Sequence, residues 1–322
     1  MRGLLVATAL LAGCYQPVVP LGVRCSPSGE CPEGQRCDQV RDLCERSPLD
    51  ANVIIDVPRD VPLDTAIDAP MLGAWNPPAF LSSLNDPAAI DTDPTISADG
   101  LELFFGSDRP GVGNLDIWHS TRTSLAATFA APTLVAELAT IGDDSAPAIS
   151  GDGLTIYFRR GTDIFRATRA TTTSPFTSVG LDAELSSAEL DTNPVVSHNG
   201  LFASVTRETT ATDRELYLYA RGSTSDAWGI PRKLIELSTP LSESGAALSD
   251  DGLQLWFHSD RGTAGGGQLD VYLASRASGF APFVAAPVTE LNTAVVESDP
   301  AVTRDLRIMV FERATELMIA TR

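Results

Sequence analysis

Five acidic residues recur at one position of internal repeats, and each stands directly before a hydroxyl residue. The pairs are Asp91 and Thr92, Asp144 and Ser145, Asp191 and Thr192, Glu243 and Ser244, and Glu297 and Ser298. Carboxylate and hydroxyl oxygens are hard ligands that suit calcium, and a ring of like charges would attract a basic peptide. The same residue types also cap backbone N–H groups, which every repeat would need equally. The pattern therefore predicts a binding site, a repeated structural contact, or both together.

A second recurrent pattern places an arginine shortly before an acid that opens a strand. The pairs are Arg109 with Asp116, Arg160 with Asp163, Arg207 with Glu215, Arg261 with Asp270, and Arg313 with Glu316. The acidic partner keeps its negative charge in the two repeats that have glutamate instead of aspartate. We interpret these as structural ion pairs within one repeat, each of which contributes little to stability if it is exposed.

The chain offers little material for nucleophilic catalysis. Its three histidines, His119, His198 and His258, fall at different positions of different repeats, and no GxSxG motif is present. The enzymatic alternative is a glycan hydrolase or lyase that uses carboxylates drawn from the five recurrent acids, because the sequence does not reveal distances between repeats. A repeated acid at equivalent positions is a poor match for an asymmetric acid and nucleophile, so a non-catalytic role is favoured.

Self-similarity defines the region that carries these residues. Five stretches align: DPTISADGLELFF from Asp93, APAISGDGLTIYF from Ala146, NPVVSHNGLFASV from Asn193, GAALSDDGLQLWF from Gly245 and DPAVTRDLRIMVF from Asp299. Their internal hydroxyl residues, Ser97, Ser150, Ser197, Ser249 and Thr303, are spaced by 53, 47, 52 and 54 residues. This is the period of a propeller blade.

Each repeat predicts four short strands. A first strand leads into a polar turn such as Asp99-Gly100, where glycine suits a tight hairpin, and second, third and outer strands follow. The last repeat ends after its third strand, and residues 75–84 have the aromatic and proline residues of an outer strand without the preceding ones. We therefore predict an all-β fold, a five-bladed β-propeller with four-stranded blades, closed by pairing its two ends.

The repeats resemble the TolB-type, WD40-like propeller repeats also called PD40. Their pattern runs from proline through Ser-x-Asp-Gly and an apolar strand to Asp-Ile-Tyr, and residues 93–120 and 146–169 match it best. The third repeat has Asn199-Gly200 instead of Asp-Gly, the fourth has Ala246 instead of proline, and the fifth has Leu306 instead of glycine. The resemblance covers about residues 75–322 and implies the propeller fold. Relatives of this kind lie in bacterial envelopes or act as interaction modules.

The first residues, MRGLLVATALLAGC, read as a secretory signal over residues 1–13 followed by Cys14. The tetrapeptide LAGC resembles the bacterial lipobox, which implies lipidation of Cys14 and a lipidated N-terminus over residues 14–24. An ordinary signal peptide with a chance cysteine is the alternative. The apolar run is too short to span a bilayer as a helix, so we expect membrane attachment through the lipid anchor only.

Four further cysteines, Cys25, Cys31, Cys37 and Cys44, are clustered in residues 25–44. Their even number in an exported chain predicts two disulfides in a small stapled knob. We favour an interleaved pairing of Cys25 with Cys37 and Cys31 with Cys44, although three pairings are possible. A structural zinc site is the alternative, but the spacing does not match the usual CxxC knuckles. Residues 45–74, rich in proline and aspartate, then predict an extended, disordered linker.

Composition narrows the class of partner. The chain of 322 residues has 42 acidic against 23 basic residues, a formal charge of −19 that argues against nucleic-acid binding. We predict a monomeric, lipid-anchored protein of the bacterial cell envelope, at the outer membrane, whose propeller binds a protein, a peptide or a glycan. Calcium at the recurrent acids is a possible ligand, and no other cofactor is expected.

Overall fold

The computed structural model describes residues 35–38, 43–46, 72–210, 213–262 and 268–322. The chain divides into two units, Met1–Asp68 and Ala69–Arg322. Among the described residues, no helix is long and apolar enough to cross a membrane. The predicted signal peptide, Cys14, Cys25 and Cys31 lie outside the described residues, as do most residues of the predicted linker.

The described part of the first unit is a hairpin of β1 (Gln35–Asp38) and β2 (Leu43–Arg46). The two strands are antiparallel, and their register sets Cys37 opposite Cys44 in the backbone ladder. The two predicted disulfides, and the zinc alternative to them, stay predictions.

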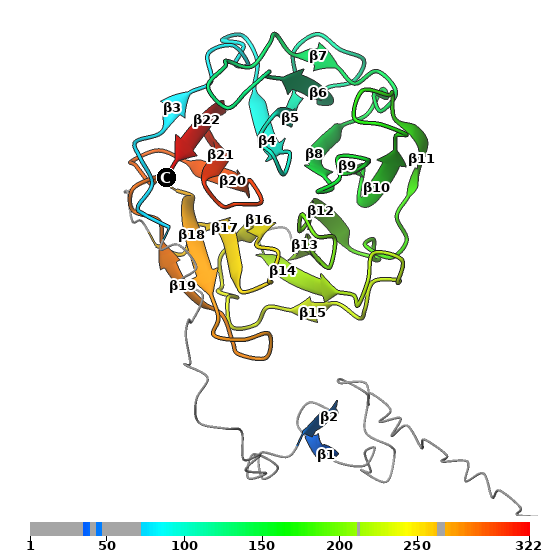
Figure 1. Cartoon of the computed structure of the whole chain (residues 1–322), viewed down its shortest axis with the longest axis vertical. Coiled ribbons are helices and arrows are strands. Elements are labelled where there is room, and N and C mark those ends of the chain that lie inside the picture. The colour runs from blue at the N-terminus through cyan, green and yellow to red at the C-terminus, as the bar shows by residue number, and fades with distance from the viewer. Residues whose placement is uncertain (1–34, 39–42, 47–71, 211–212, 263–267) are drawn as a thin grey trace, which may run out of the picture. The chain divides into compact units, whose positions relative to one another are not determined.

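The second unit is a five-bladed β-propeller, as the repeats predicted. It consists of five four-stranded sheets, which Figure 1 shows arranged around a centre. Blade 1 consists of β4 (Asp91–Ile96), β5 (Glu102–Ser107), β6 (Asp116–Thr121) and β7 (Thr133–Leu134). Blade 2 consists of β8 (Asp144–Ile149), β9 (Thr155–Arg160), β10 (Asp163–Thr168) and β11 (Thr177–Leu181). Blade 3 consists of β12 (Leu190–Val196), β13 (Phe202–Thr210), β14 (Asp213–Ala220) and β15 (Arg232–Lys233).

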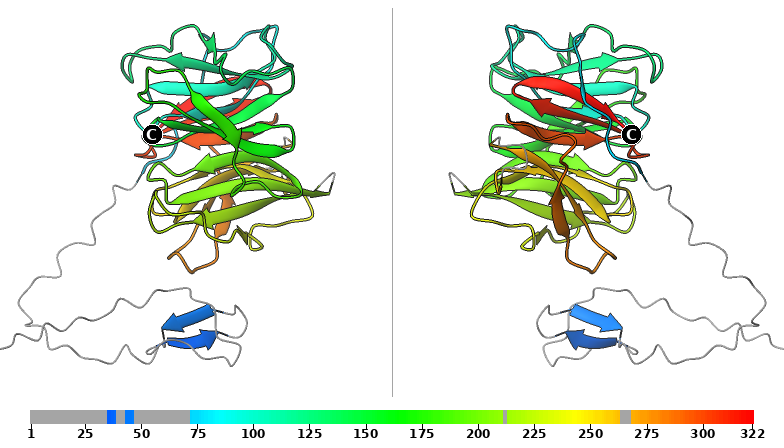
Figure 2. Two further views of the ribbon diagram at one scale, coloured as in Figure 1. Left: turned by 90° about the vertical axis from the view of Figure 1, so that its right-hand side faces the viewer. Right: turned by 90° about the vertical axis from the view of Figure 1, so that its left-hand side faces the viewer.

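The last two blades follow the same order, and the fifth takes its outer strand from the beginning of the domain. Blade 4 consists of β16 (Glu243–Leu248), β17 (Gln254–Ser259), β18 (Asp270–Ser275) and β19 (Val284–Pro287). Blade 5 consists of β20 (Glu297–Val302), β21 (Ile308–Arg313), β22 (Glu316–Thr321) and β3 (Ala79–Phe80). The pairing of β22 with β3 confirms the predicted closure, and Figure 2 shows the C-terminal end beside the segment that enters the propeller. Closure leaves blade 5 with a complete sheet.

The hydrophobic core lies between the blades, not inside any one of them. Each of five clusters combines residues of two neighbouring blades; for example, Phe104 and Ile117 of blade 1 pack with Ile156 and Phe158 of blade 2. The second strands supply most of the fully buried aromatic residues. One blade therefore cannot bury its apolar faces alone, which is the physical reason for the ring.

The first strand of each blade is innermost, because β4, β8, β12, β16 and β20 contact one another around the centre. Every inner strand has a register shift two residues after the recurrent acid. The residues at these shifts have positive φ angles, between 45° and 58°; they are Asp93, Ala146, Asn193, Gly245 and Asp299, here called the bulge residues. Bulges redirect side chains, and at this position they place the bulge residues on the channel wall.

Candidate functional site

The five recurrent acids, here called the ring acids, are buried. Asp91, Asp144, Asp191, Glu243 and Glu297 are each at most 1% exposed. Each forms an ion pair with an arginine of its own blade that lies in the second strand or within two residues after it. Arg160 Nε lies 2.6 Å from Asp144 Oδ1, Arg207 Nε 2.8 Å from Asp191 Oδ1, Arg261 Nη2 3.2 Å from Glu243 Oε1 and Arg313 Nε 2.8 Å from Glu297 Oε1, and Arg109 pairs with Asp91.

The same acids also hold the loops that enter the inner strands. Each accepts a hydrogen bond from a backbone N–H four or five residues upstream, for example from Thr140 N to Asp144 Oδ2 at 2.8 Å. The equivalent donors in the other blades are Asp86, Ser187, Thr239 and Thr293. The ring acids therefore make the repeated structural contact that their residue type allowed.

This arrangement changes the partners that the sequence indicated for the arginines. In the ion pairs that the structure records, Arg109, Arg160 and Arg261 contact ring acids, where the sequence interpretation had paired them with Asp116, Asp163 and Asp270. Arg207 and Arg313 follow the same rule. Asp116 instead accepts hydrogen bonds from the backbone N–H groups of Val112 and Gly113. Antiparallel pairing explains the difference, because the end of the second strand lies beside the start of both its neighbours, and sequence distance does not choose between them.

The hydroxyl neighbours of the ring acids make different contacts in different blades. Thr92 donates to Glu312 of blade 5, Thr192 Oγ1 donates to Asn193 Oδ1 at 3.0 Å, and Ser244 Oγ contacts Thr206 Oγ1 at 3.1 Å. Ser145 and Ser298 are buried at the same position of blades 2 and 5. The ring acids thus make the same contacts in all five blades, whereas the hydroxyl residues beside them make different contacts.

The asymmetry is strongest at the bulge residues. Asn193 Nδ2 donates to Asp299 Oδ1 at 2.8 Å and to Asp93 Oδ1 at 3.2 Å, which joins blades 3, 5 and 1 across the channel. Ala146 and Gly245 occupy the other two positions. Aspartate, asparagine and glycine tolerate positive φ angles, so the backbone accounts for the residue types but not for the side-chain cluster they form.

Asp93, Asp299 and the nearby Glu312, here called the channel carboxyls, all have raised pKa values. Burial raises the pKa of Asp93 to about 7, and the charge of Asp299 adds to the effect. Burial, followed by the charge of Glu312, raises the pKa of Asp299 to about 7. Burial also raises the pKa of Glu312 to about 7, against the hydrogen bond from Thr92. The three groups therefore titrate near neutral pH as one cluster.

These carboxyls differ from the ring acids in their cations, because Arg159 and Arg214 act on Asp93 and Asp299 from beyond ion-pair distance and lower their pKa values only in part. Within the described part of the chain, no lysine or arginine lies within ion-pair distance of any channel carboxyl. His258 Nδ1 lies 3.6 Å from Asp299 Oδ1 and accepts a hydrogen bond from Asp299 N at 3.0 Å. Burial lowers the pKa of His258 to about 3, so its ring is neutral and supplies no charge.

The channel is narrow, and a residue of blade 3 lies across its far end. Its cavity volume is about 50 Å³, enclosed by the inner strands. His198 Nε2 donates to Val302 O of blade 5 at 2.8 Å, and Arg304 Nη2 donates to His198 O at 2.6 Å. Burial lowers the pKa of His198. The polar cluster and His198 thus mark opposite ends of the inner strands.

The bulge residues were not among the functional residues that the sequence predicted. Three of the five repeats carry Asp or Asn directly before proline, as Asp93, Asn193 and Asp299 do, and this signal was present in the aligned stretches. Glu312 had no comparable signal, because the paired positions of the other second strands hold Gly106, Arg159, Thr206 and His258.

No metal centre emerges from these acids. Among the described residues, no group of three or more His, Cys, Asp or Glu is arranged to hold a metal ion. Each ring acid is instead engaged by an arginine, and we propose no calcium site there.

Comparison with known proteins supports the fold and leaves the function open. No protein-family model matches the chain, and no curated protein matches it. Among solved structures, the α-L-arabinofuranosidase PaAbf62A from Podospora anserina, in complex with cellotriose, is 14% identical with a TM-score of 0.51, over 78% of this chain and 96% of that chain.

Two TolB structures are also similar. TolB from Acinetobacter baumannii is 14% identical with a TM-score of 0.45, over 72% of this chain and 54% of that chain. The putative TolB from Agrobacterium tumefaciens is 20% identical with a TM-score of 0.40, over 59% of this chain and 61% of that chain. The chain thus spans between half and two thirds of the length of these TolB proteins. The propeller fold that the resemblance of the repeats implied is the fold that the structure shows.

Proposed function

We propose that this protein is a lipid-anchored, non-catalytic propeller of the bacterial cell envelope that binds a cationic group of a protein or peptide at the channel mouth. The observation that carries the proposal is the cluster of Asp93, Asn193, Asp299 and Glu312. Asp93 and Asp299 share the amide of Asn193, Glu312 accepts a hydrogen bond from Thr92, and none of the three carboxyls forms an ion pair with a lysine or arginine among the described residues. A lysine or arginine side chain of a partner would supply the missing charge.

The dimensions of the channel favour one charged group as the ligand. Ligand pockets usually have volumes of roughly 300–1,000 Å³, whereas this cavity has about 50 Å³. A sugar ring is too large for a channel of this volume, whereas a single ammonium or guanidinium group can bind at its mouth. Proline, alanine and valine side chains line the channel beyond the cluster, so the polar contacts are concentrated at one end.

The loops around this end also expose apolar side chains. Ile141 is 92% exposed, and Ile90, Leu241 and Val295 are between 40% and 44% exposed. All four precede a ring acid by one to three residues, in loops that enter inner strands. Exposed apolar residues around a polar centre are typical of protein-binding surfaces. A peptide with a basic residue between apolar residues fits this face best.

The envelope location rests on the N-terminal sequence. The short signal and the LAGC motif support lipidation of Cys14 and attachment at the outer membrane. In cells of a lipoprotein-processing bacterium, the full chain should fractionate with the membrane, and Cys14→Ser should move it to the soluble fraction. Membrane retention of the Cys14→Ser chain would contradict the anchor.

Binding of defined peptides tests the proposed mouth. The probe is a fluorescein-labelled nonapeptide with one central lysine between leucines, and its control has norleucine in place of lysine. Anisotropy titration of the full chain should show binding of the lysine peptide at least about tenfold tighter. The double variant Asp93→Asn with Asp299→Asn should remove that preference.

A matched charge control separates the site from the overall charge of the protein. Asp226→Asn with Glu290→Gln removes two exposed carboxylates that do not line the channel, and it should leave the preference for lysine intact. If the two double variants weaken binding equally, general attraction explains it and the proposed mouth is wrong. If the lysine and norleucine peptides bind equally, the cation is not recognised.

A second candidate, a carbohydrate-active enzyme, is favoured by one observation. The channel carboxyls have pKa values near 7, as a general acid requires, whereas the ring acids are held by arginines. Against it, the amide of Asn193 contacts both Asp93 and Asp299, so the space between these carboxyls is filled. Release of reducing sugar from a panel of polysaccharides, abolished by Glu312→Gln, would establish the enzyme and displace the binding proposal.

A further inference from the structure

The interfaces between blades differ at two equivalent positions that face the next blade. The first position is the first residue described for the second strand. The other position is on the third strand, where it pairs with the third residue of the second strand. The first is Glu102, Thr155, Phe202, Gln254 and Ile308 in blades 1 to 5, and the second is His119, Arg166, Leu218, Leu273 and Ile319.

In blade 3 this pair of positions completes the apolar interface. Phe202 and Leu218 both pack in the cluster shared by blades 3 and 4. A Cβ added at Gly252, in the turn of blade 4, would lie 2.7 Å from the Phe202 ring, so the ring fills this space. Leu273 and Ile319 pack in the corresponding clusters of blades 4 and 5.

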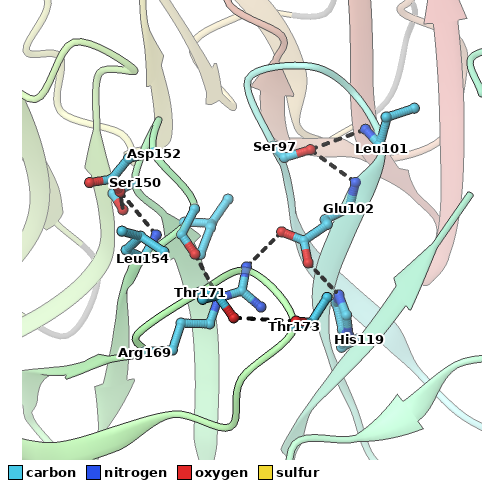
Figure 3. A network of polar contacts seen from close by, with 12 residues as sticks. Ser97, Leu101, Glu102, His119, Ser150, Asp152, Leu154, Arg169, Thr171 and Thr173 are labelled. Atoms are coloured by element: carbon cyan, nitrogen blue, oxygen red, sulfur yellow. Dashed lines mark hydrogen bonds and ion pairs between the residues drawn. The ribbon is translucent and has the colours of Figure 1, made fainter.

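In blade 1 the same space holds a charged network. Glu102 Oε2 lies 2.6 Å from Arg169 Nη2 of blade 2, and Glu102 Oε1 lies 3.2 Å from His119 Nε2 (Figure 3). Glu102 is 13% exposed and Arg169 is 3% exposed. The hydrogen bonds from His119 and Arg169 outweigh burial and hold the pKa of Glu102 below its usual value. Removing such charges from water is costly, and an apolar pair is often as stable.

Aromatic side chains form the base of this network. The His119 ring is stacked on Phe104, with ring centres 4.4 Å apart and an angle of 22° between the planes. Phe104 contacts Phe176 edge to face at 6.0 Å, and Arg169 lies over the Phe176 ring at 4.8 Å. His119 is 23% exposed, so it presents a flat, rigidly held ring at the surface.

A groove of about 610 Å³ lies over these residues, between blade 1 and the loop 169–176 of blade 2. This volume is within the usual range of small-molecule sites. The groove shares no lining residue with the channel. It is therefore a separate site, and the inference from it does not depend on the proposed channel mouth.

The lining of the groove indicates the class of ligand. Its carboxylates, Asp99, Glu102 and Glu137, outnumber its guanidinium groups, Arg122 and Arg169, which disfavours anions. Hydroxyls of Thr121, Thr133, Thr172, Thr173 and Ser174 surround them, and hydroxyls both donate and accept hydrogen bonds. Balanced donors and acceptors beside a flat ring suit a neutral ligand that carries many hydroxyl groups.

We propose that the groove between blades 1 and 2, built on Glu102, His119 and Arg169, binds a neutral saccharide. The ring of His119 provides the face on which a sugar ring lies. Glu102, held by the hydrogen bond from Arg169 and by the nearby ring of His119, and the surrounding threonines select hydroxyl groups. The charged network of blade 1 is thus kept at an interface where blades 3 and 5 place an apolar pair because it forms a ligand site.

The test uses the full chain and five neutral trisaccharides: maltotriose, cellotriose, xylotriose, mannotriose and chitotriose. Saturation-transfer difference NMR followed by calorimetric titration should find at least one of them bound with a dissociation constant of about 1 mM or tighter. His119→Leu introduces the residue that blades 3 and 4 carry, and it should weaken binding at least about tenfold. Arg166→Leu, the same change at the equivalent position of blade 2, is the matched control and should leave binding unchanged.

Three further measurements make the result decisive. Thermal unfolding of both leucine variants should show that each is folded, and Glu102→Gln, which keeps the shape of the side chain, should weaken binding in the same direction as His119→Leu. The channel variant Asp93→Asn with Asp299→Asn should bind the sugar normally. Absence of binding by all five sugars, equal binding by His119→Leu, or preference for an anionic trigalacturonate would overturn the proposal.

Discussion

Two of the channel carboxyls, Asp93 and Asp299, lie two residues after ring acids in the same inner strands, yet the environments of the two sets of acids are opposite. Asp191 is fully buried and paired with Arg207, whereas Asp299 is 12% exposed and lies beside a neutral histidine, the amide of Asn193 and the hydroxyl of Ser298. The first set repeats in all five blades, and the second occurs in two inner strands and one second strand. The ring acids, which repeat in every blade, therefore assemble the fold. The channel carboxyls, which do not repeat, are available to bind a ligand.

The largest effect should come from breaking a ring contact. Arg207→Met would leave the carboxylate of Asp191 buried without its cation. Removing one partner of a buried ion pair costs about 3–5 kcal/mol, so urea unfolding should show a loss of that size in the free energy of unfolding. A loss below about 1 kcal/mol would mean that the ring contacts behave as exposed pairs and that the comparison is wrong.

One substitution made at both positions should have opposite effects. Asp191→Asn removes the charge that Arg207 needs and should destabilise the protein. Asp299→Asn removes a charge that burial disfavours, and at pH 8 it should stabilise the fold by on the order of 2 kcal/mol. Denaturant unfolding of both variants in the same buffer checks the signs. Destabilisation by both would place Asp299 among the structural residues.

The pH dependence of stability should come from the channel carboxyls. Their pKa values rise from 3.8 for Asp93 and Asp299, and 4.5 for Glu312, to about 7. Between about pH 4 and 7 the folded chain therefore holds protons that the unfolded chain has released, so its stability falls as the pH rises through this window.

His258 acts in the other direction, because its pKa falls from 6.5 to about 3 on folding. Its contribution is present above pH 6.5 and is lost as the pH falls below that value. The stability difference between Asp299→Asn and the unmodified chain isolates the carboxyl, and it should grow from pH 5 to pH 8. A constant difference over this range would show that Asp299 titrates normally.

The smallest effect should come from the backbone of the bulge. Ala146 has a φ of 50° at the position where other blades have aspartate, asparagine or glycine. Ala146→Gly should remove the strain of the positive φ angle and stabilise the protein by about 0.5–1 kcal/mol. Thermal unfolding measures the change. If the variant is less stable, packing of the Ala146 methyl group outweighs the strain.

Several features of the fold were determined by the sequence alone. Five aligned stretches with turn residues such as Asp99-Gly100 were enough to predict five blades, four strands each and closure by residues 75–84. These features follow from local patterns that recur, because each blade must make the same hairpin and bury the same faces. The ring acids and the hydroxyl residues after them could also be recognised in the sequence. Their repetition predicted that they make a structural contact in every blade.

Only the tertiary structure decided which residues meet across the ring. Asp93, Asn193 and Asp299 are 100 and 106 residues apart in the chain and are brought together at the channel, and Glu102 meets Arg169 only because blade 2 packs on blade 1. The recorded ion pairs of the recurrent arginines with the ring acids of the first strands were likewise decided by the packing of the strands. Contacts between blades depend on how closed sheets pack, which no local pattern encodes, whereas the strands and turns of a blade depend on neighbours in sequence.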